Sequence, residues 1–187
     1  MRQKGNGTEC YYEICINLKP VHEGEVIMLK YASWGHGNTL AVERPGDVVV
    51  QRWGWGTELR THTSPSPSTW CHIAIPTPVI INDARMKVQN LFLLFETGQH
   101  ASIDNVHIYD GPDKIAAWDV VAGSNYSARR SGHHSKSIDG QNTFVLPAPH
   151  EVRFGLSISF TFIAVAQSAW DDPEARLLIT TAGADFF

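Results

Sequence analysis

Residues 152–162 read Val152-Arg153-Phe154-Gly155-Leu156-Ser157-Ile158-Ser159-Phe160-Thr161-Phe162, and this stretch decides the fold. Large apolar residues alternate with small or polar ones along its whole length. Because successive side chains of a strand point to opposite faces, the pattern predicts a long strand, about Val152 to Ala166, that buries six apolar groups on one face. The opposite face carries Ser157, Ser159 and Thr161, which suit either an open concave wall or plain solvent.

The rest of the chain supports an all-β fold. Short apolar runs are separated by turn residues, and no segment shows a helical period with caps. About ten strands with short turns predict an antiparallel β-sandwich or jelly roll, because the intervals are too short for crossover helices. The expected strands are Tyr11–Asn17, Glu25–Ala32, Asn38–Glu43, Asp47–Trp53, Trp70–Ile75, Met86–Glu96, Ser102–Tyr109, Lys114–Val120, Thr143–Leu146, Val152–Ala166 and Ala175–Thr181.

The alternation changes beyond Phe162. Ile163 and Val165 place large apolar groups at the opposite parity. This shift predicts a β-bulge, or a strand end that is buried on both faces.

Composition limits the partners. The chain has 187 residues with a formal net charge of -4, so it has no general attraction for nucleic acid. No apolar run reaches the length of a membrane span, and the first seven residues lack the apolar core of a signal peptide. We therefore expect no nucleic-acid partner, no membrane span and, by default, a cytoplasmic location, with export by another route left open.

The three cysteines do not make a disulfide framework. Cys10 and Cys15 are five residues apart and would point to opposite faces of a strand, and Cys71 could pair with either. We expect buried free thiols.

A polar stretch from Gly123 to Asn142 interrupts the strand rhythm. It contains a local basic cluster, in which Arg129, Arg130, His133, His134 and Lys136 lie close together in the sequence. Such a stretch is either a solvated mobile loop or an arm that grips an anion, a neighbouring subunit or an acidic partner.

The nine histidines do not form a metal-binding motif, so we predict neither a metal site nor another cofactor. Hydrolase elbows, phosphate loops and dinucleotide fingerprints are also missing from the sequence.

Aromatic clusters are the best candidates for binding. Trp53-Gly54-Trp55-Gly56 is expected to place two tryptophans on one face at a strand end. Trp34-Gly35-His36-Gly37-Asn38 has a similar order of residue types, with an aromatic residue, glycine and polar residues. Exposed tryptophan suits sugar stacking or a protein interface, although these rings could equally plug the ends of the core. The predicted ligand-binding residues are Trp53, Trp55, His36, Asn38, Arg60 and Tyr109, with Asp110 adding direction.

Two segments, Ile75-Pro76-Thr77-Pro78-Val79-Ile80 and Val106-His107-Ile108-Tyr109-Asp110-Gly111, carry a family resemblance. Together they resemble small single-domain bacterial β-sandwich proteins of unknown function. The resemblance covers Gly35 to the C-terminus, supports the fold and implies no site residue. We therefore expect a sandwich domain at 35–187, preceded by a strand-forming extension at 1–34 that packs on the domain or on a partner subunit.

Two classes of function remain open. The first is a non-catalytic protein that binds a glycan, a small apolar molecule or a protein partner. The second is a small enzyme, with or without a metal ion, whose site in a sandwich or barrel mouth pairs His72 or His107 with Glu58 or Asp110 as acid and base. The terminal Phe186-Phe187 pair is either tucked into the core or offered to a partner, so we also expect a homo-oligomer.

Overall fold

The computed structural model describes residues 29–61, 68–121, 128–164 and 172–187. Within these ranges the chain is almost entirely antiparallel strand, with two short 3-10 turns, η1 (Gly37–Thr39) and η2 (Pro45–Asp47), and no α-helix that could cross a membrane. The strands are β1 (Tyr31–His36), β2 (Ala41–Val42), β3 (Val48–Trp53), β4 (Gly56–Thr61), β5 (Thr69–Ala74), β6 (Ile80–Ile81), β7 (Ala84–Arg85), β8 (Lys87–Thr97), β9 (Ala101–Asp110), β10 (Asp113–Trp118), β11 (His133–His134), β12 (Thr143–Glu151), β13 (Leu156–Ala164) and β14 (Arg176–Phe186).

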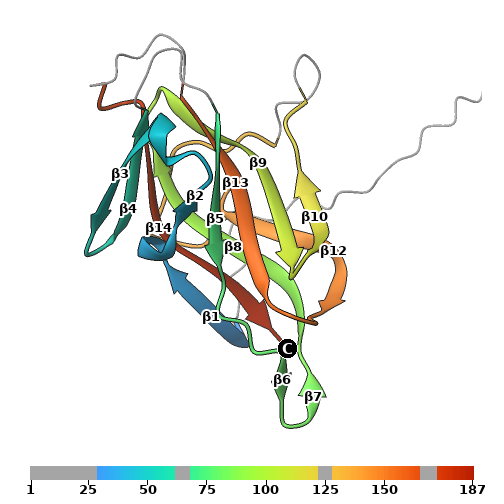
Figure 1. Cartoon of the computed structure of the whole chain (residues 1–187). Coiled ribbons are helices and arrows are strands. Elements are labelled where there is room, and N and C mark those ends of the chain that lie inside the picture. The colour runs from blue at the N-terminus through green and yellow to red at the C-terminus, as the bar shows by residue number, and fades with distance from the viewer. Residues whose placement is uncertain (1–28, 62–67, 122–127, 165–171) are drawn as a thin grey trace, which may run out of the picture.

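Two sheets form a sandwich, which confirms the predicted fold class. The front sheet in Figure 1 has the order β10-β9-β13-β5-β2. The back sheet has the order β11-β8-β14-β4-β3, with β1 beside β14 and β12 beside β8, and β6 and β7 form a separate small hairpin. The core between the sheets contains fully buried aromatic and aliphatic side chains from both, among them Leu59, Ile73, Phe95, Phe144, Ile158, Phe160 and Ile179.

The alternating stretch is shorter as a strand than its pattern predicts. β12 ends at Glu151 in the back sheet, and β13 begins at Leu156 in the front sheet. Five of the six apolar groups are buried as expected, but Phe154 is 64% exposed. The prediction was wrong at Phe154 because the chain turns there to pass from one sheet to the other.

One buried carboxylate holds this turn. Asp110, at the end of β9, accepts the backbone N–H groups of Arg153, Phe154 and Gly155 at 2.7–3.0 Å. Those N–H groups would otherwise belong to a strand ladder. The carboxylate therefore ends the alternation and starts β13 in the front sheet.

The register between β13 and β9 is irregular at Thr161, before the shift that was predicted at Ile163. Pairing of β13 with β9 shifts between Phe160 and Phe162, and the extra residue is in β9. There the Thr161 hydroxyl accepts the backbone N–H of Asn105 at 2.9 Å. This bulge belongs to β9. From Phe162 to Ala164 the pairing with β9 is regular, so the bulge predicted at Ile163 is not formed in the described part of β13, and Val165 lies outside the described residues.

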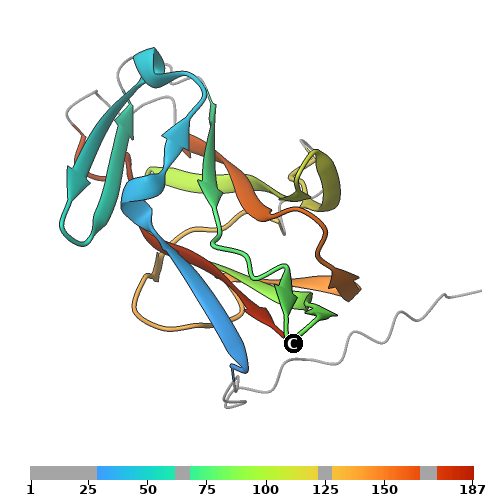
Figure 2. The same cartoon turned by 60° about the horizontal axis from the view of Figure 1, so that its bottom comes forward.

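The two ends of the described chain lie side by side. Figure 2 shows β1, in blue, running along β14, in dark red, and their pairing extends from Tyr31 with Phe186 to His36 with Thr181. β1 therefore spans the domain boundary that we expected at residue 34, while residues 1–28 lie outside the described ranges. Of the terminal rings, Phe186 is buried in the core and Phe187 is 41% exposed.

The Trp34 ring packs against the outer face of the back sheet. It stacks on Phe92 with ring centroids 5.4 Å apart. It also covers Gly183, where an added Cβ would lie 2.3 Å from a ring carbon of Trp34. Only glycine leaves room for the ring at this position.

The sequence analysis predicted no strand at β4, and it treated the turn between β3 and β4 as the end of β3. Trp53 pairs with Gly56, so Gly54 and Trp55 form a tight two-residue hairpin turn between β3 and β4. Trp55 consequently belongs to the turn and not to the same strand face as Trp53. The expected strand Asn38–Glu43 is also largely replaced, by η1 and the two-residue β2.

Cys71 is a free and fully buried thiol, as predicted. Burial, together with the negative charge of Glu43, raises its pKa to about 12. The Cys71 thiolate is therefore suppressed at neutral pH. Cys10 and Cys15 lie outside the described residues.

The close approach of Trp34 to Gly183 leads to a stability prediction. Gly183→Ala should lower the free energy of unfolding by about 1–3 kcal/mol, because the new methyl group must displace the Trp34 ring. Gly46→Ala is the matched control, since nothing lies within 4 Å of its added Cβ. Urea unfolding followed by tryptophan fluorescence measures both, and equal midpoints for the two variants would contradict this packing.

Candidate functional site

Three neighbouring strands of the front sheet bring their polar faces together. Cross-strand partners in a ladder lie on the same face, and Ser159 of β13 pairs with His72 of β5 on one side and with His107 of β9 on the other. One step along β13, Ser157 pairs with Tyr109. In the other direction, Thr161 pairs with Trp70.

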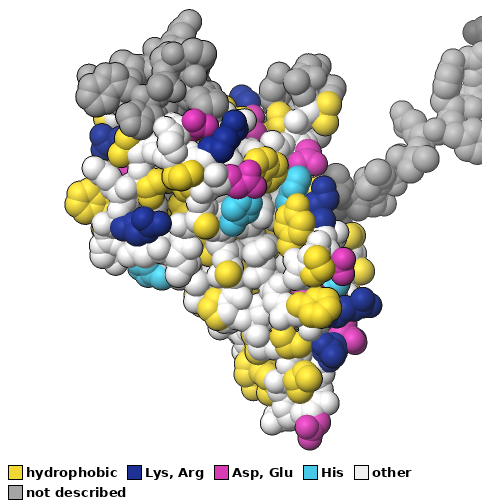
Figure 3. Space-filling view, viewed as in Figure 1, with side chains coloured by type: hydrophobic (Ala, Val, Ile, Leu, Met, Phe, Trp, Pro, Cys, Tyr) yellow, Lys and Arg dark blue, Asp and Glu magenta, His cyan; other side chains and the backbone are white. Residues whose placement is uncertain are grey.

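These side chains form a trough on the outer face of the front sheet. Small hydroxyl groups of β13 make its floor, and the larger rings of β5 and β9 make its walls. The hollow has a volume of about 500 Å³ and is lined by Glu43, Trp70, His72, His107, Tyr109, Gly111, Ser157 and Ser159. Figure 3 looks onto this face and shows histidines beside acidic side chains, with hydrophobic side chains between them.

The ring of Trp70 meets the ring of His107 across β13. Their centroids are 4.7 Å apart, although the two residues stand on strands that flank β13. The rings can meet only because the side chains beneath them are as small as threonine and serine. His107 in turn lies beside Tyr109, with centroids 6.3 Å apart.

Each histidine of the trough is hydrogen-bonded to a carboxylate. His72 Nε2 lies 3.2 Å from Glu43 Oε1, and His72 Nδ1 lies 2.8 Å from Ser159 Oγ. His107 Nε2 lies 2.7 Å from Asp119 Oδ1. For neutral rings, these partners assign the proton to Nε2 in both histidines, and Ser159 then donates to His72 Nδ1.

Three of the predicted site residues come together here, namely His72, His107 and Tyr109. Glu43 and Asp119 were missed, because they lie at strand ends where acidic residues are usual and only the folded register brings them beside a histidine. The serines of β13 were predicted as a candidate concave wall, and they form the floor.

A second group of predicted residues gathers at the β3–β4 hairpin. The Asn38 side-chain amide donates to the backbone oxygen of Trp53 at 2.8 Å, and its backbone N–H donates to His36 Nδ1 at 3.2 Å. Trp53 is 46% and Trp55 43% exposed. Asn38 and His36 thus hold the hairpin end, and both tryptophans are open to solvent, so they do not plug the core.

The two carboxylates expected for acid-base chemistry are engaged elsewhere. Glu58 is nearly buried and accepts the Arg60 Nε–H at 2.6 Å. Asp110 accepts from His150 Nε2 at 2.9 Å, in addition to its three backbone donors. Neither Glu58 nor Asp110 faces a histidine of the trough, so the predicted pairing of His72 or His107 with these carboxylates is not formed.

At Asp110, hydrogen bonds lower the pKa of the carboxyl group more than burial raises it. Burial alone would raise the pKa of its carboxyl group, but the His150 hydrogen bond and the three backbone N–H groups together lower the pKa to about 2. The residue is a structural anchor whose oxygens are already occupied.

The described part of the basic loop, residues 128–142, is tied to both sheets. Arg130 exchanges two backbone hydrogen bonds with Ile103 of β9, and Gly132 bonds to Thr97 of β8. The Arg129 guanidinium holds the buried carboxylate of Asp104 at 2.6–2.8 Å. This segment therefore bridges the sheets, and Arg129, His133 and His134 each lie beside a carboxylate of the same chain.

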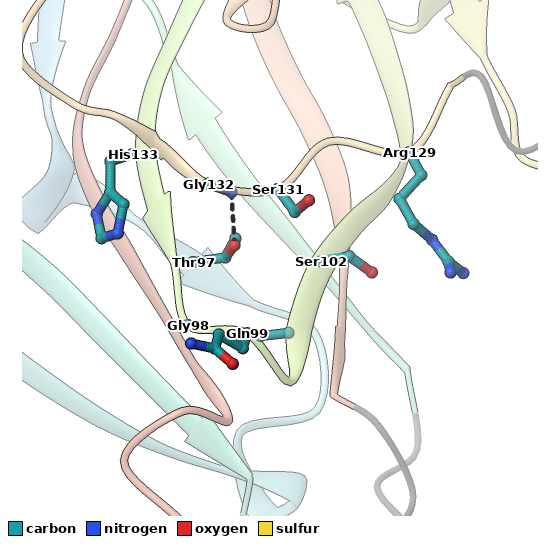
Figure 4. A pocket seen from close by; sticks show the side chains of 9 residues that line it. Thr97, Gly98, Gln99, Ser102, Arg129, Ser131, Gly132 and His133 are labelled. Atoms are coloured by element: carbon teal, nitrogen blue, oxygen red, sulfur yellow. Dashed lines mark hydrogen bonds between the residues drawn. The ribbon is translucent and has the colours of Figure 1, made fainter.

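A second hollow of about 410 Å³ lies beside this bridge (Figure 4). It is lined by Thr97, Gly98, Gln99, Ala101, Ser102, Arg129, Ser131, Gly132 and His133. Its two basic side chains already have carboxylate partners, since Arg129 bonds to Asp104 and His133 lies 3.1 Å from Glu96. Its walls carry no aromatic ring other than the 74% exposed His133 imidazole, so we take the trough as the candidate site.

Among the described residues, no three histidine, cysteine or acidic side chains gather in a way that could hold a metal ion.

Comparison with known protein families gives a match over half of the chain. Residues 28–124 fit a family described as "Family of unknown function (DUF6623)". The predicted resemblance to an uncharacterised family is therefore confirmed, with a match that starts just before β1 and includes the trough residues of β5 and β9. No curated protein matches the chain.

The Asp110 anchor leads to a prediction of acid stability. Its pKa is about 2 in the folded protein against an ordinary value of 3.8, so it contributes stability above pH 4 that is lost as the pH falls from 4 towards 2. Asp110→Asn should lose about 2 kcal/mol at pH 7 and show a flatter decline below pH 4. Urea unfolding from pH 7 to pH 2.5 measures this, and an unchanged acid limb would remove Asp110 from the explanation.

Proposed function

Since the chain belongs to this family of unknown function, we propose a role from its own site: it is a non-catalytic protein that binds a glycan in the trough. The observation that carries the proposal is the arrangement of rings and hydroxyls across β5, β13 and β9. Aromatic walls suit the apolar face of a sugar ring, and a floor of serine hydroxyls suits its hydroxyl groups.

The polarity of the trough favours a sugar over a small apolar ligand. The serine floor and the carboxylates at the edge would lose hydrogen bonds to water if an apolar molecule covered them. A sugar replaces those bonds with its own hydroxyl groups.

The alternative binding function is recognition of a protein partner through the β3–β4 hairpin. Trp53 and Trp55 are both exposed, and rings of this kind anchor protein interfaces. Neither ring lines the trough, so the two binding surfaces can be tested separately.

An enzyme is the second candidate function, and one observation favours it. Glu43, His72 and Ser159 form a hydrogen-bonded chain of carboxylate, imidazole and hydroxyl, which is the arrangement that activates a serine nucleophile. Against this role, β13 is paired along both edges at Ser159, so the nearby backbone N–H groups are committed to the sheet and do not offer an oxyanion hole. A fluorophosphonate probe tests this function, and labelling of the protein but not of Ser159→Ala would replace the binding proposal with a catalytic one.

Self-association is a separate part of the proposal. Tyr31, at the start of the edge strand β1, is 57% exposed, and Phe187 is exposed beside it. Light scattering after size-exclusion chromatography tests it, and a monomer mass at high concentration would exclude it.

The trough proposal predicts different effects for two aromatic substitutions. Tyr109→Ala should weaken retention on immobilised neutral oligosaccharides at least tenfold, because it removes one wall of the trough. Trp55→Ala should leave retention unchanged. Affinity chromatography on gluco-, manno- and galacto-oligosaccharide columns measures both.

Each of these variants should unfold within about 1 kcal/mol of the natural protein, as is usual for surface positions. Loss of retention in Trp55→Ala alone would move the site to the hairpin. No retention of the natural protein on any column would contradict the glycan proposal.

A further inference from the structure

We propose that the trough selects saccharides without an acidic group and rejects their uronic acid counterparts. This inference rests on the proposed glycan binding and names the class of sugar. It follows from the charges and from the proton positions of the two histidine–carboxylate pairs.

Negative charge gathers at the trough. Glu43 lines it, and Asp119 lies next to it through its 2.7 Å bond to the lining residue His107. The side chains of Glu43 and Asp119 are 53% and 48% exposed. Among the described residues, neither carboxylate has an arginine or lysine within salt-bridge distance, and their hydrogen-bond partners are the two histidines. Lys114 pairs with Tyr109 and so stands on the same face, one strand further out, and it does not line the trough.

The trough also presents several hydrogen-bond acceptors. Because each Nε2–H donates to a carboxylate, the neutral His107 ring carries no proton on Nδ1, and that atom is an acceptor. Ser159 gives its proton to His72 Nδ1, so its oxygen is also left as an acceptor. Each carboxylate has a second oxygen with further acceptor capacity.

Donors in the trough are fewer. Trp70 contributes one indole N–H, and Tyr109 and Ser157 contribute one O–H each. A sugar hydroxyl can donate to the acceptors, whereas an ionised carboxylate can only accept and would also approach two like charges. The same site thus favours a CH₂OH group over a COO⁻ group on an otherwise identical ring.

Matched methyl hexosides and methyl hexuronides test this selection. The pairs have gluco, galacto and manno configuration, and the two members of each pair differ only at C6. Binding is measured at pH 7.5 by protein-observed NMR titration. We expect at least one neutral hexoside to bind about tenfold or more tightly than its uronide.

Charge-neutral variants test the cause. Glu43→Gln/Asp119→Asn keeps acceptor oxygens for both histidines while removing two negative charges. It should reduce the preference for the neutral sugar to about threefold or less, mainly through tighter uronide binding. Glu151→Gln/Asp83→Asn is the matched control, since it removes the same charges from the end of β12 and from the β6–β7 turn and should leave the preference unchanged.

The outcomes separate this inference from the proposal beneath it. If at least one sugar binds but no hexoside binds about tenfold more tightly than its uronide, the selection is overturned and glycan binding stands. An unchanged preference in Glu43→Gln/Asp119→Asn likewise overturns it, because charge is then not the cause. If none of the six sugars binds, the selection fails, and retention on the oligosaccharide columns decides the glycan proposal separately.

Discussion

The position of β13 in the middle of the front sheet is the constraint on which the structure depends. On its inner face, Ile158 and Phe160 must be large to fill the core between the sheets. On its outer face, Ser159 and Thr161 must be small, because Trp70 and His107 meet above them from the flanking strands. One alternating sequence therefore satisfies the core and shapes the trough at the same time. A larger side chain on the outer face would leave the core intact and fill the hollow.

The length of that strand is set from outside its own sequence. Alternation by itself would continue back through Phe154 to Val152, and nothing in the local pattern marks where the strand begins. Asp110 sets the start of β13, because it accepts the N–H groups of Arg153, Phe154 and Gly155 from more than forty residues away. A buried aspartate that accepts three backbone bonds is a long-range contact, and only the folded chain reveals it. Phe154 is exposed as a result. Its place in the alternation predicts the buried face of a strand, but its backbone lies in a turn.

The same limit explains how much of the site could be predicted. In each strand of the trough the sequence alternation marks a polar face: Trp70 and His72 in β5, His107 and Tyr109 in β9, and the serines of the floor in β13. The sequence did not say that these three strands are neighbours in this register, because pairing between distant strands leaves no local mark. Glu43 and Asp119 were hidden for a further reason, since acidic residues next to turns are common for their own backbone contacts. The prediction that Trp53 and Trp55 share one strand face was wrong, because Gly54 and Trp55 form a tight turn where an extended strand was expected.

Two kinds of histidine–carboxylate pair in this chain show why surroundings decide a role. His150 and Asp110 are joined at 2.9 Å, but the carboxylate is buried and its oxygens also accept three backbone N–H groups, so the pair holds a turn. His72 with Glu43 and His107 with Asp119 have similar geometry at the edge of an open hollow, where such pairs contribute little to stability. Folding requires only a small polar face above β13, and it does not require two oriented imidazoles and two aromatic rings around that face. Side chains that the core does not need, held in fixed directions over open space, are the features expected of a binding surface.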